Sequence, residues 1–205
     1  MGIFDLLKRK PKVNGIIKYL KLEDWWLNEL TEEDRQIILY TYSPMGGEGS
    51  IVDGEIKSSS QTQLHFFCGL IGWFSKPSLR HIAYKLIAKA ETLIDQQSDP
   101  LDVHFLYGSK LEVCYKDRDT HPNGLDLAIK ACEQQIENAP SASKAFIRKC
   151  GGDLPAHKGF QQLAIVLEKQ KRYDEAISLC EKAKSQGWAG DWDKRIERCS
   201  KRARA

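Results

Sequence analysis

The chain has 205 residues, of which 41% are hydrophobic and 29% are charged, and this balance is typical of a soluble globular protein rather than a disordered one. Its longest apolar run, LHFFCGLIGWF at 64–74, is about half the length of a membrane-spanning helix, which needs ~20 residues. The first residues contain no apolar segment of a secretory signal. We therefore expect a cytoplasmic protein without a transmembrane segment.

The net charge of +3 is unevenly distributed along the chain. Residues 1–12 carry four basic side chains against Asp5, and residues 194–205 carry six against Glu197, so the part between them is net acidic. A nucleic-acid-binding surface usually needs a basic stripe on the folded body. We expect 1–12 to form a basic N-terminal tail, and nucleic-acid binding through the two tails is one alternative function.

Residues 13–61 predict two helices followed by a long loop. The first helix is expected through IIKYLKLEDWWLNEL and the second through TEEDRQIILYTY, where Thr31 stands at the N-cap position. Trp25 and Trp26 are neighbours in the first helix, where successive side chains point about 100° apart. We therefore expect one of the two indoles to stay partly exposed.

The loop at 43–63 reads SPMGGEGSIVDGEIKSSSQTQ and is rich in glycine and serine. It contains neither of the glycine-rich phosphate-binding motifs, GxxxxGK[ST] and GxGxxG. Asp53-Gly54 between short apolar segments predicts a small hairpin or a tight turn. Because long loops in compact domains are often functional, an enzyme or nucleotide-binding regulator that uses the 43–63 loop is the main alternative function.

Residues 62–205 show a weak internal repeat of helix pairs. Ala83, Ala128 and Ala176 stand at comparable places in the second helix of each pair, 45 and 48 residues apart. Prolines occur at or near the expected breaks, and Pro140 follows the end of the fourth helix. The expected pairs are 62–73 with 77–96, 100–116 with 123–138, and 156–170 with 173–186.

A further helix is expected at the end of the chain. Trp188, Trp192 and Ile196 recur at i, i+4 and i+8, so both indoles are expected to cover the open end of the stack, as terminal repeats require. The predicted fold is therefore all-α, with stacked antiparallel helix pairs over 62–205, a C-terminal capping helix, and the helices and long loop of 13–61 as an extension of one continuous domain.

The six cysteines are far apart, and none lies in a CxxC pair or at a spacing typical of a metal site. Cys132 and Cys180 fall on apolar helix stripes, where a free thiol behaves as a small hydrophobic residue. We expect free buried thiols in a reducing compartment, and neither a metal nor a cofactor.

The last pair resembles a tetratricopeptide repeat. Phe160, Leu163-Ala164 and Leu167 occupy the family's positions in the first helix, and Ala176 and Ala183 occupy the two small positions of the second. The middle pair departs from the pattern, because its turn KDRDTHPNG is enlarged, and the first pair matches only at two alanines. The resemblance implies a short right-handed solenoid, and the chain as a whole is similar to bacterial proteins of unassigned function.

By this resemblance, the concave face lined by first helices binds a peptide or a partner protein. We therefore expect a non-catalytic adaptor whose partner is a protein or peptide. The resemblance carries the binding role to these positions: Phe105, Ser109, Glu112, Lys158, Gln161, Ile165, Glu168 and Lys169.

No familiar catalytic motif accompanies this pattern. Catalysis needs a base with an oriented partner, and the sequence shows none for its histidines, which have no metal-ligand spacing either. Ser58, Ser59 and Ser60 lack the GxSxG turn of serine hydrolases. We expect structural or solvated roles for His65, His81, His104, His121 and His157.

Overall fold

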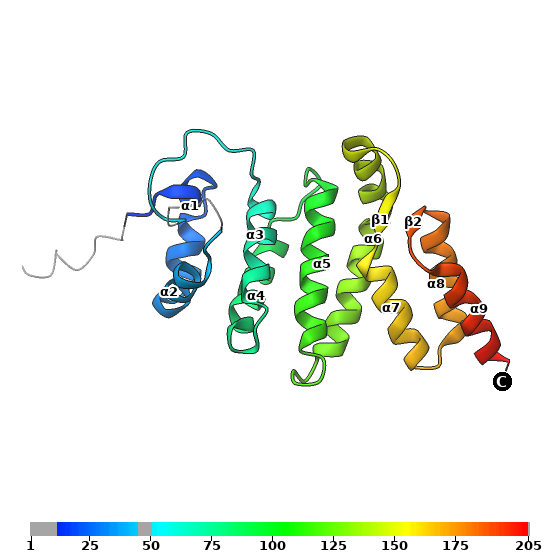
Figure 1. Ribbon diagram of the computed structural model, residues 1–205. Coiled ribbons are helices and arrows are strands. Elements are labelled where there is room, and N and C mark those ends of the chain that lie inside the picture. Colours follow the sequence, from blue (N-terminus) through cyan, green and yellow to red (C-terminus); the bar gives the residue numbers. More distant parts are fainter. Residues whose placement is uncertain (1–11, 45–50, 205) are drawn as a thin grey trace, which may run out of the picture.

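The computed structural model describes residues 12–44 and 51–204 and is mostly helical, as the all-α prediction requires. Figure 1 shows the helices side by side in a row that follows the order of the chain. The predicted basic tail, except for Lys12, and residues 45–50 of the 43–63 loop lie outside the described residues. Within the described part of the chain, no helix is both long and apolar enough to cross a membrane.

The row begins with a short helix α1 (Gly15–Tyr19), a π-helical turn (Trp25–Glu29) and helix α2 (Glu32–Thr41). The second predicted helix and its cap are confirmed, because Thr31 Oγ1 accepts a hydrogen bond from Asp34 N at 3.1 Å and the Asp34 carboxylate accepts one from Thr31 N at 2.9 Å. The first predicted helix is not continuous. Lys21, with φ 57°, has a left-handed backbone that ends α1 before the tryptophans.

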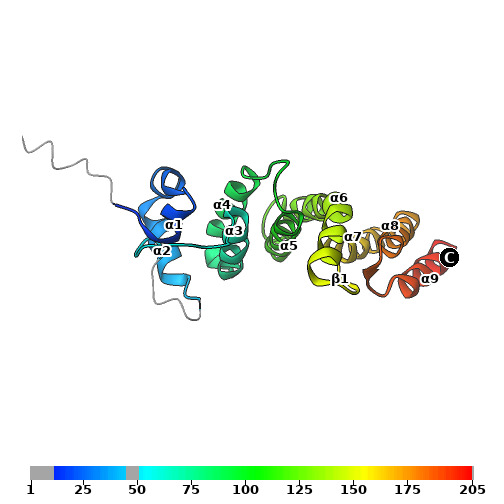
Figure 2. The same ribbon diagram turned by 90° about the horizontal axis from the view of Figure 1, so that it is seen from above.

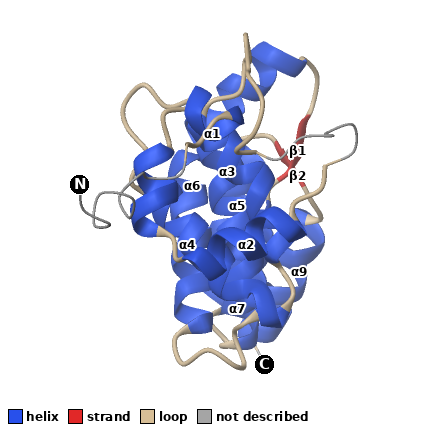
Figure 3. Ribbon diagram, turned by 90° about the vertical axis from the view of Figure 1, so that its left-hand side faces the viewer, coloured by secondary structure: helices blue, strands red, loops and turns tan. Residues whose placement is uncertain are grey.

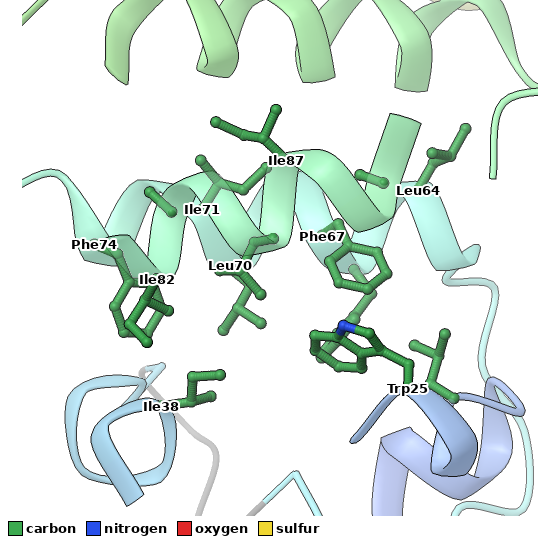
Figure 4. Close-up of a cluster of buried hydrophobic side chains, with 14 of the residues drawn as sticks. Trp25, Ile38, Leu64, Phe67, Leu70, Ile71, Phe74, Ile82 and Ile87 are labelled. Carbon is green, nitrogen blue, oxygen red and sulfur yellow. The ribbon is translucent and has the colours of Figure 1, made fainter. Parts of the chain in front are cut away.

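The expectation that one of the two tryptophans stays exposed is wrong, since both are buried. The Trp25 ring lies 4.9 Å from Phe67 and 5.9 Å from Trp26, in edge contacts. Figure 4 shows the indole of Trp25 pointing at Phe67 on the neighbouring helix. The π-helical turn belongs to a core that α1, α2, α3 and α4 share, so both sides of the turn are covered.

The described part of the long loop packs against α1. Residues 51–52 form a turn and Asp53-Gly54 a bend, and none of the four pairs as a strand, so of the two expected forms the structure has the turn. Carbonyls of this turn accept hydrogen bonds from the first amides of α1, with Ile17 N to Ile51 O at 3.1 Å and Gly15 N to Gly54 O at 3.0 Å. A Cβ at Gly15 would lie 2.6 Å from Ile51 O, so only glycine permits this approach.

The three predicted helix pairs are confirmed as packed neighbours, and Figure 2 shows them following one another along the row. Short 3₁₀ turns at Gly72–Phe74 and Pro77–Leu79 connect the first pair. A last helix packs on the third pair, with Trp192 and Cys199 buried. The helices are α3 (Gln63–Ile71), α4 (Arg80–Glu91), α5 (Pro100–Lys116), α6 (Gly124–Cys150), α7 (Lys158–Lys169), α8 (Tyr173–Ser185) and α9 (Trp192–Ala203).

Helix α6 does not end before Pro140 as expected, but continues to Cys150. Proline inside a helix costs about 3 kcal/mol, because it removes a hydrogen bond and crowds the preceding turn. Pro140 lies on the exposed side of α6, whereas Ala139, Ala142 and Ala145 are buried on the other side. Continued packing of these small residues outweighs the local preference of proline.

Two short strands were not expected from the sequence. Strand β1 (Leu154–Ala156) pairs in parallel with β2 (Trp188–Ala189). Figure 3 shows them side by side at the edge of the helical stack. They join the segment after α6 to the segment after α8, and they bury Leu154 and Trp188 in the core of this half of the chain.

Candidate functional site

A groove of about 600 Å³ lies between α3, α5, the end of α6, β1 and the start of α7. We call it the α3–α7 groove. Its lining combines aromatic and small side chains with a few polar groups, which is typical of ligand-binding sites. The lining residues are His65, Cys68, Gly69, Asp102, His104, Phe105, Gly108, Ser109, Gln135, Phe146, Pro155, Ala156 and Lys158.

Three of the eight predicted site residues, Phe105, Ser109 and Lys158, line this groove. Three others, Glu112, Gln161 and Ile165, line a hollow of about 340 Å³ that shares Lys158 with the groove. The structure therefore brings six of the eight residues to one continuous face of α5 and α7. Lys169 lies further along α7, in another hollow beside Arg118 and Asp119.

Glu168 lies apart from the others and holds α9 instead. Its carboxylate accepts hydrogen bonds from Arg195 and from Arg198, the latter at 2.9 and 3.1 Å, and Arg202 lies 3.8 Å away. Burial alone would raise the pKa of the Glu168 carboxyl, but the hydrogen bonds and charges of Arg198 and Arg195 outweigh it and lower that pKa. This residue joins α7 to the capping helix.

The largest half-exposed side chain in the groove is Phe105, which is 49% exposed. Its ring lies 6.0 Å from that of Phe146, in an edge contact. Phe146 stands in the part of α6 that continues past Pro140, so sequence reasoning, which ended the helix at 138, did not predict this wall of the groove. The two rings give the groove its apolar character.

Two buried histidines stand behind this wall. The ring of His104 lies 5.0 Å from that of His157 and stacks on Trp188 at 5.6 Å. His157 Nδ1 accepts a hydrogen bond from Phe160 N at 3.3 Å and so caps α7. His104 Nδ1 and His157 Nε2 are buried and have no hydrogen-bond partner among the described residues.

Both imidazoles are neutral at neutral pH. Burial, with a smaller effect of the Lys158 charge, lowers the pKa of His104 to about 4. Burial and the proximity of His104 lower the pKa of His157 to about 3. Neither ring can act as a proton acceptor near pH 7 without a large cost, which makes them structural parts of the groove wall.

Gln135 fixes the spacing of the helices around the groove. Its buried side-chain amide donates to the carbonyl of His104 at 2.9 Å and accepts from Gly159 N at 2.7 Å. A Cβ at Gly108 or at Gly159 would lie 2.9 Å from this amide, so both positions require glycine. Gln135 was not predicted, because a glutamine inside a helix carries no pattern that marks it as buried.

Asp102 and Cys68, which also line the groove, have protein partners. Asp102 accepts a hydrogen bond from Thr62 Oγ1 at 2.6 Å and lies 3.6 Å from His65 Nδ1. Burial and the charge of Asp102 raise the pKa of Cys68 to about 12, so its thiol stays protonated and is a poor nucleophile. Among the described residues, no group of three or more His, Cys, Asp or Glu side chains could hold a metal ion.

A second hollow, of about 570 Å³, lies beside the described part of the 43–63 loop and is lined by Lys12 and Lys18, among others. Phosphate binding at a helix start needs free backbone amides. Here Asn14 N, Gly15 N and Ile17 N already donate to carbonyls of the loop. This hollow therefore offers lysine charge but not the amide cradle of a nucleotide site.

No family model, curated protein or solved structure matches the chain.

The buried histidines predict a loss of stability in mild acid. Their folded-state pKa values lie below the unfolded value of about 6.5, so the stability that the neutral rings contribute is present above pH 6.5 and is lost as the pH falls. Between pH 7.5 and 5.0 we expect urea unfolding to show a decrease of about 2 kcal/mol per histidine. In His104→Phe the decrease should be about half as large; an unchanged pH dependence would contradict the assignment.

Gly108 lies close to Gln135, whereas Gly69 has open space beside it. We therefore expect alanine at these two glycines of the groove to have opposite effects on the free energy of unfolding. Gly108→Ala should lower the free energy of unfolding by about 1–3 kcal/mol, because the methyl group meets an amide that two hydrogen bonds hold in place. Gly69→Ala is the matched control. No atom lies within 4 Å of its added Cβ, so it should raise stability by about 0.5–1 kcal/mol through helix propensity. Equal effects in urea unfolding would refute the packing around Gln135.

Proposed function

We propose that this chain is a tetratricopeptide-like helical-repeat adaptor that binds a peptide segment of a partner protein in the α3–α7 groove. The observation that carries the proposal is the half-exposed Phe105 beside Phe146, in a groove that opens onto the face of α5 and α7. An exposed aromatic ring in a concave apolar site is typical of protein-binding anchors. The adjoining hollow at Gln161 and Ile165 extends this face along α7.

The packing of the third helix pair supports the repeat interpretation. Phe160 and Ala164 on α7 and Ala176 and Ala183 on α8 are all fully buried. Small residues at these positions allow two helices to approach closely. These are the residues on which the resemblance to a tetratricopeptide repeat depends, and α5 and α7 are the first helices of their pairs.

The hydrogen bonds and protonation of the polar groups in this groove favour ligand binding over catalysis. Asp102 is held by Thr62 and His65, the Gln135 amide is held by two backbone groups, and the Cys68 thiol is protonated. We therefore propose a non-catalytic role, and we propose that it takes place in the cytoplasm, since all six cysteines are free thiols.

Nucleic-acid binding through the C-terminal basic segment has less support. In α9, Arg195 and Arg198 bind Glu168, and Lys201 pairs with Glu197 at 2.6 Å. These ion pairs reduce the positive charge that is free to displace counterions from a phosphate backbone. The groove, rather than α9, is the surface that we assign to the partner.

The proposal predicts that Phe105→Ala strongly weakens partner binding while the chain stays folded. Truncation of a central aromatic anchor typically costs 2 kcal/mol or more of binding energy, which corresponds to about a 30-fold loss of affinity. Affinity purification from the native host, with quantitative mass spectrometry, should recover partners with the wild-type chain that the variant loses. Tyr40→Ala is the matched control, because Tyr40 is an exposed aromatic residue on α2, 90% exposed and remote from the groove. Identical partner sets for the wild type and Phe105→Ala would contradict the proposal.

A further inference from the structure

Within this proposed function, we infer the chemistry of the segment that the α3–α7 groove takes: a partner peptide with an apolar side chain, aromatic or branched, and a carboxylate within about three residues of it. The inference depends on the proposed function and adds which peptide side chains the groove recognises. It is carried by the shape of the apolar end of the groove and by the exposed charge of Lys158 at its rim.

The apolar end offers space for a side chain. Phe105 and Phe146 form one side in edge contact, and Pro155 and Ala156 of β1 also line the groove. On α3, Gly69 lines the groove without a side chain, and nothing lies within 4 Å of the position of a Cβ there. An apolar side chain that enters this space gains contact with two aromatic rings.

The exposed charge at the groove is positive. Apart from its histidines, the groove is lined by one acidic residue, Asp102, and one basic residue, Lys158. The Asp102 side chain is only 13% exposed and is held by Thr62 and His65, whereas the Lys158 side chain is 63% exposed. Lys158 also shares the carboxylate of Glu112 with Lys116, each at 3.2 Å. Glu112 therefore divides its charge between two lysines, and Lys158, the more exposed of the two lining charges, can pair with a carboxylate of the partner.

The size of the groove sets the spacing of the two groups. A hollow of about 600 Å³ is on the order of 8–10 Å across, which an extended chain covers in about three residues. The carboxylate that pairs with Lys158 and the side chain that contacts Phe105 therefore belong to the same short segment.

The test is selection of peptides from a random linear heptapeptide library displayed on phage, against the immobilised full chain. The wild type should enrich peptides that combine Phe, Trp, Leu or Ile with Asp or Glu within three positions, by about tenfold or more over the unselected library. Lys158→Glu should reverse the preference, so that Lys and Arg replace the acidic residues. Lys130→Glu, an exposed lysine of α6 that does not line the groove, is the charge control and should select the wild-type pattern.

A second variant separates this inference from the proposed function. Gly69→Leu fills the groove from α3 and should select none of the wild-type peptides. Circular dichroism checks that this variant folds. Phe105→Ala repeats the test without adding volume to the groove. If groove-dependent peptides show no acidic preference, or keep it in Lys158→Glu, the inference is overturned and the proposed function stands. If no peptides are enriched, or if both groove variants bind the same peptides as the wild type, both are overturned.

Discussion

The side chain of Gln135 is the constraint on which the geometry of the groove depends. Its amide group on α6 donates a hydrogen bond to the carbonyl of His104 on α5 and accepts one from the backbone amide of Gly159 in the first turn of α7. An amide buried without partners would cost about 1–3 kcal/mol, so both bonds must be kept. The helices can come this close only because Gly108 and Gly159 have no side chain to meet Gln135. The distances between α5, α6 and α7, and so the width of the groove, follow from this contact.

The groups behind the groove keep its wall in place. His104 and His157 pack against Trp188, which strand β2 holds beside β1, so the aromatic cluster ties the end of α8 to α5 and α7. At the other end of α7, Glu168 and the arginines of α9 attach the last helix. Both sets of contacts leave Phe105 and Lys158 exposed at the groove that we propose as the binding site. A rigid support with a few half-exposed side chains is suited to recognition of a peptide.

Patterns of neighbouring residues predicted the elements whose ends and faces depend on nearby residues in the sequence. The acids after Thr31 marked the start of α2, and the spacing of Ala83, Ala128 and Ala176 identified the second helices of the three pairs. Tertiary contacts decided the rest. Pro140 ends a helix by its own preference, but the buried alanines around it keep α6 continuous. Strands of two and three residues have too few side chains for an alternating pattern.

The sequence also predicted only part of the candidate site. Six of the eight positions share one face because residues three or four apart on a helix lie together. Glu168 pairs with Arg195 and Arg198 of α9, which lie 27 and 30 residues further along the chain, so only the packing of α9 on the stack brings them together. Phe146 and Gln135 could not be assigned to the groove from the sequence, since one depends on the length of α6 and the other on contacts between three helices.

The claim that the α3–α7 groove is the binding site is tested most directly by two-dimensional ¹⁵N–¹H NMR of the full chain during titration with a bound peptide. The largest shifts should fall on the amides of Phe105 and Ser109 on α5 and of Lys158 at the start of α7, with small shifts on α9 and on residues 51–61. Shifts centred on α9 or on 51–61, with those three amides unchanged, would contradict the assignment of the groove.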